Sequence, residues 1–238
     1  MRKTIVKKKS LLYWLLVRIP VWLVVVSLAL VFLFKWVPVR YTPFMLRRSI
    51  EGRTDTSYQV RKAWVPLEAI SPELVKAVIL SEDRHFAVHH GFDFGEMKKV
   101  WKAHREAGLP LRGCSTISQQ TAKNVFTQGR RTWFRKAAET WWTLWVEGLW
   151  GKRRILEVYL NVVEMGKGVF GIEAASQAYF GIPAKELTRE QAIRLATCLP
   201  VPLLTSPFDP PDAKRSRLQD WLRRTIPTVS FPDWVEQR

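Results

Sequence analysis

Glu82 has an unusual position for a charged side chain. It follows Val78 and Ile79 by four and three residues and precedes Phe86 by four, so on a helix it would share their apolar face. Burial raises the pKa of a carboxyl group, which suits a general acid or base near neutral pH. The alternative is a buried ion pair or a capping carboxylate, because structural ion pairs also shift pKa values.

Glu139 is the second carboxylate with a notable setting. It follows Arg135 by four residues and Lys136 by three, so both cations would lie beside it on one helix face. On a surface helix such a pair stabilises by only about 0.3–0.5 kcal/mol. The surrounding segment is typical either of a lipid-contacting surface or of a hydrophobic core. It contains Trp133, Trp141, Trp142, Trp145 and Trp150.

A third polar segment, residues 113–124, reads GCSTISQQTAKN. Ser115 and Thr116 would present hydroxyl and backbone N–H groups at a helix N-terminus, which favours phosphate or sugar binding. An N-capped, solvated helix fits the same spacing. The polar face continues with Gln119, Gln120, Lys123 and Asn124.

Other enzyme motifs are missing from the sequence. It contains no phosphate-binding G-x-x-x-x-G-K-[ST] loop, no G-x-G-x-x-G, no H-E-x-x-H and no transpeptidase S-x-x-K or K-T-G. The two cysteines, Cys114 and Cys198, are far apart, and two unpaired thiols are a simpler interpretation than a disulfide.

Helical periodicity dominates the elements that must position these side chains. Strand signals are scarce, so the sequence predicts an all-α (mainly helical) domain of about 180 residues, without a second domain or an internal repeat. The helices are expected over residues 72–86, 93–107, 115–126, 132–150, 152–163, 170–180, 188–199 and 210–225.

The N-terminus predicts a membrane anchor. Residues 1–10 form a basic tail, and residues 11–37 are apolar except for Arg18 and Lys35, which is long enough for one transmembrane helix. A cleaved signal peptide is the alternative, although the apolar run is long for one. Residues 38–66 are expected to be a connector and residues 67–238 the folded domain.

Charge indicates the side of the membrane and the type of partner. The positive-inside rule keeps the basic tail in the cytoplasm and puts residues from about 40 onward outside, which in a bacterium is the periplasm. Seven of the 38 basic residues and none of the 21 acidic ones lie in residues 1–38, so the exported part keeps a net charge of +10. The location outside the membrane disfavours nucleic acid as a partner, so the positive charge favours anionic phospholipid or a lipid-linked phosphate.

The order of the polar segments resembles the family 51 glycosyltransferases, the peptidoglycan glycosyltransferases. Five motifs of that family match in order, with small departures at Cys114, Ser118 and Gly181. They are SEDRHFAVHHG (81–91), GCSTISQQ (113–120), RKAAE (135–139), KRRILEVYLN (152–161) and GVFGIEAASQAYFG (168–181). Because transpeptidase motifs are missing, the chain looks like a monofunctional, membrane-anchored member.

The resemblance implies a lysozyme-like fold with a head lobe and a smaller, membrane-facing jaw lobe. It also implies that lipid II is polymerised into β-1,4-linked glycan strands with inversion, releasing undecaprenyl pyrophosphate, without transpeptidase activity. The expected location is the bacterial inner membrane, as a single-pass protein with a periplasmic catalytic domain. The growing glycan strand and other cell-wall synthesis proteins are the expected partners.

Roles for individual residues come from the same resemblance. Glu82 would be the general base, and Glu139 would help to hold the donor pyrophosphate, through a divalent cation (Mg²⁺ or Mn²⁺). Asp83 would orient its neighbours and Glu157 is expected to be structural, whereas for His89 a functional and a purely structural role both stay open. Substrate contacts are expected from Ser115, Thr116, Gln119, Gln120, Lys123, Asn124, Arg130, Arg135, Lys136 and Lys152.

Two rival functions remain at this stage. A lytic, lysozyme-like glycosidase would also use a glutamate on a helical fold, but it would cut finished glycan and would need no pyrophosphate-binding residues. An anchored scaffold of the cell-wall machinery would need no catalytic carboxylate at all.

Overall fold

The chain divides after Val37 into two units, Met1–Val37 and Pro38–Arg238, in a computed structural model. The structure describes residues 13–55, 58–111, 113–127 and 132–236. The predicted basic tail, residues 1–10, and the first two residues of the predicted span lie outside these ranges.

The described part of the first unit is helical. A π-helical turn, η1 (Trp14–Arg18), continues into α2 (Ile19–Trp36), and the helix ends where Val37 becomes extended before Pro38. The stretch Trp14–Trp36 contains an 18-residue window with a mean hydropathy of 2.5 and is long and apolar enough to cross a membrane. The Arg18 guanidinium lies 4.2 Å from the Trp14 ring, which offsets part of the cost of its charge there.

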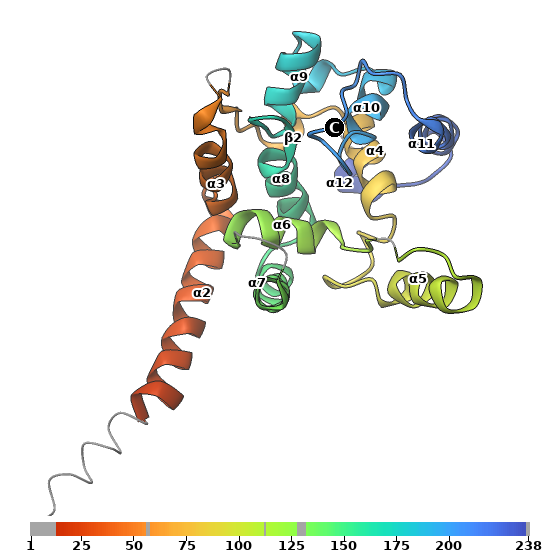
Figure 1. Ribbon diagram of the computed structural model, residues 1–238. Coiled ribbons are helices and arrows are strands. Elements are labelled where there is room, and N and C mark those ends of the chain that lie inside the picture. Colours follow the sequence, from red (N-terminus) through yellow and green to blue (C-terminus); the bar gives the residue numbers. More distant parts are fainter. Residues whose placement is uncertain (1–12, 56–57, 112, 128–131, 237–238) are drawn as a thin grey trace, which may run out of the picture. The chain divides into compact units, whose positions relative to one another are not determined.

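The second unit is mainly helical, which confirms the predicted fold class (Figure 1). Three single-turn 3₁₀ helices, η2 (Gly52–Thr54), η3 (Leu67–Ala69) and η4 (Ala184–Glu186), join longer elements. The helices are α3 (Pro43–Glu51), α4 (Pro72–Glu82), α5 (Phe94–Ala107), α6 (Ile117–Phe126), α7 (Trp133–Leu149), α8 (Lys152–Val162), α9 (Ile172–Phe180), α10 (Arg189–Ala196), α11 (Ala213–Thr225) and α12 (Asp233–Glu236).

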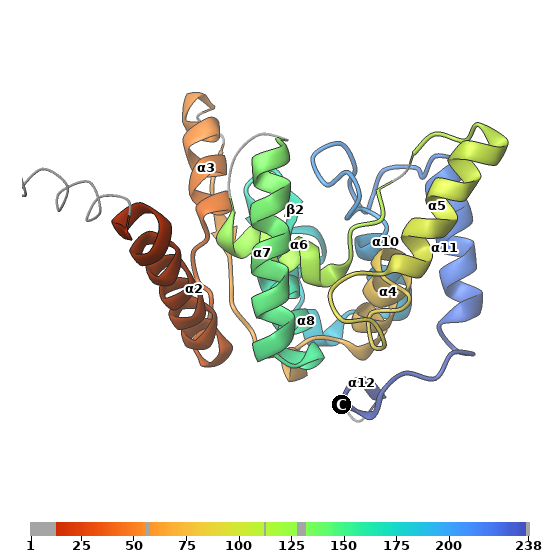
Figure 2. The ribbon, with the colours of Figure 1, turned by 90° about the horizontal axis from the view of Figure 1, so that it is seen from below.

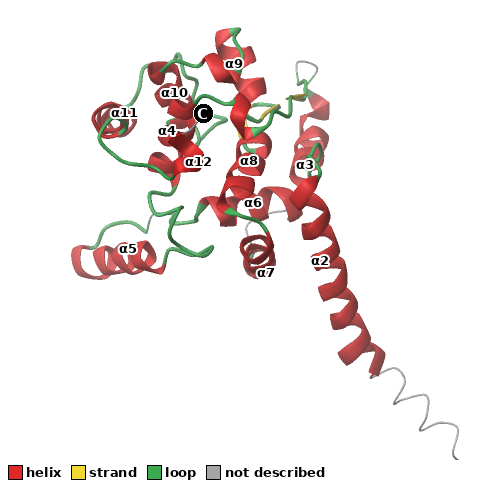
Figure 3. Cartoon of the chain, turned by 180° about the vertical axis from the view of Figure 1, so that it is seen from behind, coloured by secondary structure: helices red, strands yellow, loops and turns green. Residues whose placement is uncertain are grey.

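The strands of the described residues are short and form one small sheet (Figure 3). Their order is β1 (Arg61–Lys62), β3 (Val169–Phe170), β2 (Glu164–Gly166), with β1 parallel and β2 antiparallel to β3. The sheet therefore joins the segment before α4 to the segment between α8 and α9.

Two groups of helices carry the core of the second unit (Figure 2). In one, α6 packs against α3, α7 and α8; in the other, α4 packs against α10, α11 and α12. α8 contributes several large side chains to the core, including Ile155, Leu156, Tyr159 and Leu160, all fully buried. Both cysteines are free thiols, as the sequence favoured.

Capping residues explain where the helices begin. Thr116 and Gln119 form a capping box at α6, and Thr188 and Gln191 form another at α10. Pro72 occupies the first turn of α4, where its missing N–H costs nothing. The C-terminal end of α4 differs from expectation, because the helix stops at Glu82 and residues 83–91 form turns.

The segment expected as a connector, 38–66, contains regular structure. Thr42 caps α3 by accepting a hydrogen bond from Met45 N (3.1 Å), and Arg48 pairs with Glu164 (3.0 Å). Further on, buried Asn161 of α8 accepts a hydrogen bond from Val65 N and donates one to Val65 O, both 2.9 Å long. These contacts fix the segment to the folded unit.

Replacing Asn161 should therefore loosen this attachment. Asn161→Ala leaves both Val65 backbone groups without their partner, and we expect a loss of about 2–3 kcal/mol in the free energy of unfolding. Tm of the full-length protein in detergent, followed by circular dichroism, should fall by about 5–10 °C. Gln177→Ala, at an exposed position of α9, is the control and should change Tm by less than about 2 °C. An equal Tm for Asn161→Ala and the wild type would contradict this role.

Candidate functional site

Glu82 is the last residue of α4 and is only partly exposed. Gln120 Nε2 of α6 donates a hydrogen bond to its Oε2 (2.8 Å), and the Tyr159 hydroxyl donates to Gln120 Oε1 (3.3 Å). Burial raises the pKa of Glu82, while the Gln120 hydrogen bond and the charge of Lys123 oppose the rise. A carboxylate with a raised pKa and one oxygen not bonded to Gln120 suits proton transfer.

A hydrogen-bond network fixes the chain directly after Glu82. The buried Asp83 carboxylate accepts from His89 Nε2 (2.8 Å) and from Ile117 N (2.9 Å) at the start of α6. Gly91 N donates to His89 Nδ1 (3.1 Å), so Nδ1 is the acceptor and Nε2 carries the proton. This geometry agrees with the orienting role expected for Asp83, and it gives His89 a structural role, because both of its ring nitrogens are hydrogen-bonded within the network.

Gly91 completes this network, because its carbonyl accepts a hydrogen bond from Thr116 Oγ1 (2.7 Å). Its φ of +88° is unfavourable for residues with a Cβ atom, and a Cβ there would lie 2.9 Å from Thr143 Cγ2. Only glycine fits both conditions. The last residue of the first motif, Gly91, is therefore hydrogen-bonded to Thr116 of the second motif.

The polar face predicted on residues 115–124 divides into two groups. Thr116 and Gln119 are buried, and their side chains bond to each other's backbone N–H in the capping box. Asn124 is buried as well, whereas Ser115 is exposed. Only Gln120 and Lys123 are brought toward Glu82 by α6.

Glu139 lies buried on α7 between two cations. Its Oε2 accepts from Arg135 Nη1 at 2.8 Å, and its Oε1 pairs with Lys136 Nζ. Burial lowers the pKa of Lys123, with Arg135 and Lys136 adding to the effect, while Glu139 and Glu82 oppose it. We call Lys123, Arg135 and Lys136 the cation cluster. It lies within electrostatic reach of both carboxylates, whereas Arg130 lies outside the described residues.

Lys152 is placed elsewhere. Its ammonium pairs with the Glu147 carboxylate (2.6 Å) and lies 4.8 Å from the Phe86 ring centre. The Glu147 carboxylate also accepts a hydrogen bond from the Ser118 hydroxyl. Glu147 follows Glu139 by eight residues on α7, which is about 12 Å along the helix. Lys152 is therefore not part of the cation cluster in this structure.

The tryptophan-rich segment was expected to be either a lipid-contacting surface or part of the hydrophobic core, and it contains both exposed and buried rings. Trp133, at the start of α7, is 92% exposed, while Trp150, at the end, is 3% exposed. Trp142 stacks on Phe126 with ring centres 4.3 Å apart. The N-terminal end of α7 is thus exposed on the protein surface, whereas Trp142 and Trp150 pack against other side chains of the second unit.

Sequence reasoning missed three groups near the site. Glu147 gave no signal because its partner lies beyond a helix break, and Tyr159 looked like an ordinary core position. Arg84, two residues after Glu82, lies 4.1 Å from the ring centre of Trp221 on α11. Nothing local in the sequence indicates that contact.

No cluster of three or more His, Cys, Asp or Glu side chains suited to a metal ion occurs among the described residues. Both Glu139 oxygens are already paired with cations. The protein groups alone therefore do not fit a bound divalent cation.

Comparison with known proteins places the chain. The family model described as Transglycosylase matches residues 50–225, which contain all five motifs. The chain belongs to this transglycosylase family. The match confirms the family resemblance and the lysozyme-like, mainly helical domain that it implied.

Curated relatives in the transglycosylase family are similar over nearly the whole chain. A biosynthetic peptidoglycan transglycosylase of Pseudomonas putida is 43% identical over 217 residues, 91% of each chain. The protein of the same name from Rhodospirillum centenum is 46% identical over 202 residues, 85% of each chain. The one from Pseudomonas aeruginosa is 42% identical over 215 residues, 90% of this chain and 92% of its own.

The pairing of Lys152 predicts that its loss lowers stability. Lys152→Met leaves a buried carboxylate without its cation, so we expect about 2–4 kcal/mol less free energy of unfolding and a clearly lower Tm. The double variant Glu147→Gln/Lys152→Met should recover most of this loss, because the amide oxygen introduced in place of the carboxylate still accepts from Ser118. An unchanged Tm together with a raised KM would instead indicate the substrate contact expected from the sequence.

Proposed function

We propose that this protein is a membrane-anchored peptidoglycan glycosyltransferase that polymerises lipid II into β-1,4-linked glycan strands. The observation that carries the proposal is a partly buried glutamate of raised pKa, Glu82, within electrostatic reach of Lys123 in the cation cluster, whose other two members pair with Glu139. Membership of the transglycosylase family and the names of the relatives support the same reaction.

Glu82 acts as the general base. Gln120 holds Oε2, and the other oxygen takes the proton from the 4-hydroxyl of the acceptor sugar. The freed oxygen attacks the anomeric carbon of the donor strand from the face opposite its pyrophosphate. The new glycosidic bond forms as the bond to the pyrophosphate oxygen breaks, so the configuration inverts from α to β.

The cation cluster stabilises the leaving group. Negative charge grows on the pyrophosphate as its bond to the sugar breaks, and fixed cations aimed at that charge lower the barrier. Glu139 keeps Arg135 and Lys136 in place before substrate arrives. The cost of ordering them is therefore met on folding.

The divalent cation expected at Glu139 stays a prediction. Since the protein groups alone do not fit one, most of its ligands would have to be pyrophosphate oxygens of the bound substrate. We assign no reaction step to it. Loss of activity on chelation with EDTA, restored by Mg²⁺ or Mn²⁺, would support it.

The proposed location is the bacterial inner membrane. The helix Trp14–Trp36 would be the single span, with the basic N-terminal tail in the cytoplasm and the catalytic unit in the periplasm. Lipid II and the growing strand are then the partners, with other cell-wall synthesis proteins nearby. The relatives are named biosynthetic, which speaks against the lytic alternative, and a partly buried glutamate of raised pKa speaks against a pure scaffold.

Removing the base should abolish turnover without unfolding the protein. We expect Glu82→Gln to lower kcat/KM for lipid II by about 10²–10⁴-fold, the usual contribution of a positioned general base. Polymer formation by the full-length protein in detergent is the measurement, with Tm as the check on folding. Glu73→Gln, in the first turn of the same helix where Glu73 pairs with Arg189, is the matched control and should stay active. A fully active Glu82→Gln would reject the mechanism, and fragments released from finished peptidoglycan would favour the lytic enzyme.

The raised pKa of Glu82 also predicts a pH dependence. The base works only when deprotonated, so activity should fall with falling pH through that raised pKa, above the usual value of 4.5. Gln120→Leu removes a hydrogen bond that lowers the pKa, so the acidic limb of kcat/KM should move to higher pH. Gln177→Leu should leave the profile unchanged. A limb that stays in place or moves to lower pH would contradict the assignment.

A further inference from the structure

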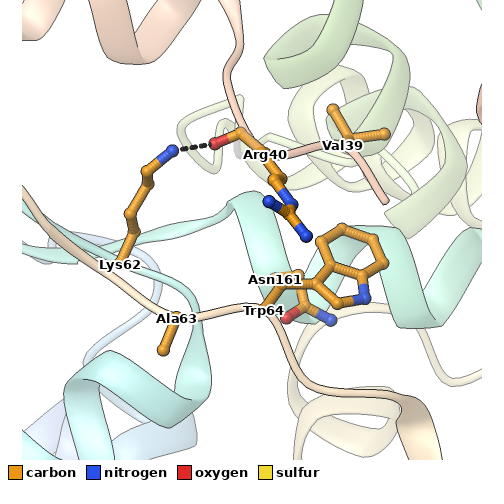
Figure 4. A pocket seen from close by; sticks show the side chains of 6 residues that line it. All are labelled: Val39, Arg40, Lys62, Ala63, Trp64 and Asn161. Atoms are coloured by element: carbon orange, nitrogen blue, oxygen red, sulfur yellow. Dashed lines mark hydrogen bonds between the residues drawn. The ribbon is translucent and has the colours of Figure 1, made fainter. Parts of the chain in front are cut away.

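A cavity of about 220 Å³ lies at the start of the second unit, and neither Glu82 nor a member of the cation cluster is among its lining residues. Its lining combines two basic side chains with one tryptophan and contains no acidic residue. The lining residues are Val39, Arg40, Lys62, Ala63, Trp64 and Asn161 (Figure 4). The composition is typical of a site for an anion that carries an apolar group.

The walls of the cavity are held by specific contacts. Lys62 Nζ donates to the Arg40 carbonyl and lies over the Tyr41 ring, while its backbone pairs with Phe170 in the sheet (Figure 4). Arg154 lies 5.2 Å from the Trp64 ring centre. The cavity is therefore built by the fold rather than by a loose loop.

The two cations at the cavity have no acidic partner. In the part of the chain that the structure describes, no carboxylate lies within ion-pair distance of Arg40 or Lys62. Other basic side chains of the unit, such as Arg48 and Lys152, do have one. An exposed guanidinium and an ammonium without counter-charges favour a phosphate as ligand.

Covalent attachment to the span limits how far the cavity can lie from the bilayer. Arg40 follows Trp36, the last residue of the apolar helix, by four residues, so their Cα atoms are at most about 14 Å apart. The headgroup layer outside the hydrocarbon is itself about 5–8 Å thick on each side. Any orientation of the folded unit thus keeps Arg40 close to the lipid phosphates. Tryptophan is also enriched at this level.

We propose that the cavity of Arg40, Lys62 and Trp64 binds the headgroup phosphate of an anionic phospholipid in the leaflet next to the folded unit. The volume corresponds to about seven water molecules, which is room for a phosphoglycerol group. The inference uses the membrane span of the proposed function and not the reaction. It assigns a lipid site separate from the cation cluster.

Native mass spectrometry of the full-length protein in neutral detergent with added phosphatidylglycerol tests the site. We expect the wild type to retain phosphatidylglycerol over phosphatidylcholine, and Arg40→Gln/Lys62→Gln to bind it about 25-fold more weakly, about 5-fold per lost cation. Arg47→Gln is the matched control, because this nearby basic residue is paired with Glu51 and should leave retention unchanged. A Tm equal to that of the wild type ensures that the double variant is folded.

Several outcomes would overturn the inference. These are equal retention by the double variant and the wild type, displacement of the lipid by equimolar inorganic phosphate, or failure of the wild type to float with phosphatidylglycerol vesicles. The double variant should keep polymerising lipid II in detergent without phospholipid. Loss of that activity would assign the cavity to the substrate instead. Inactivity of the wild type with intact lipid retention would reject the proposed function alone.

Discussion

The Asp83 carboxylate joins the end of one helix to the start of another, and the geometry of the site depends on this contact. It accepts hydrogen bonds from the backbone of Ile117 and from His89, so it fixes α4 against α6 and shapes the turns between them. Because Glu82 precedes Asp83 and Gln120 follows Ile117 by three residues, the same contact sets the distance between the two. A positive helix N-terminus stabilises the buried negative charge.

The two carboxylates of the site differ because their surroundings differ. Glu139 is compensated by two cations on its own helix, so it serves as a fixed counter-charge. Glu82 receives one neutral hydrogen bond and is otherwise desolvated, so its charged form is less favoured. Divergent environments for paired carboxylates are a general way to obtain one base and one electrostatic group.

Local patterns predicted much of this arrangement. The apolar spacing around Glu82, the helix N-terminus at Thr116 and the i, i+4 relation of Arg135 to Glu139 depend only on neighbours in the sequence. Features that depend on contacts between residues far apart in the sequence could not be predicted from local patterns.

The pairing of Lys152 with Glu147, the attachment of Val65 to Asn161 and the stop of α4 at Glu82 are the tertiary cases. In the last of these, helical periodicity continues to Phe86, but Asp83 gains more from α6 and His89 than from another helical turn. Motif similarity indicated which residues belong to the site. The fold shows which of them are already bound to one another by hydrogen bonds and ion pairs.

The helix that carries Glu82 is packed by the last elements of the chain. α4 contacts α11 and α12, Lys76 pairs with Glu236, and Arg84 lies against Trp221. Synthesis runs from the N-terminus, so α11 and α12 are made only after the apolar N-terminal helix and all five motifs. A nascent chain thus contains Glu82 before it contains the helices that pack against α4. The alignment of Glu82 therefore has to wait until α11 and α12 have been made and packed.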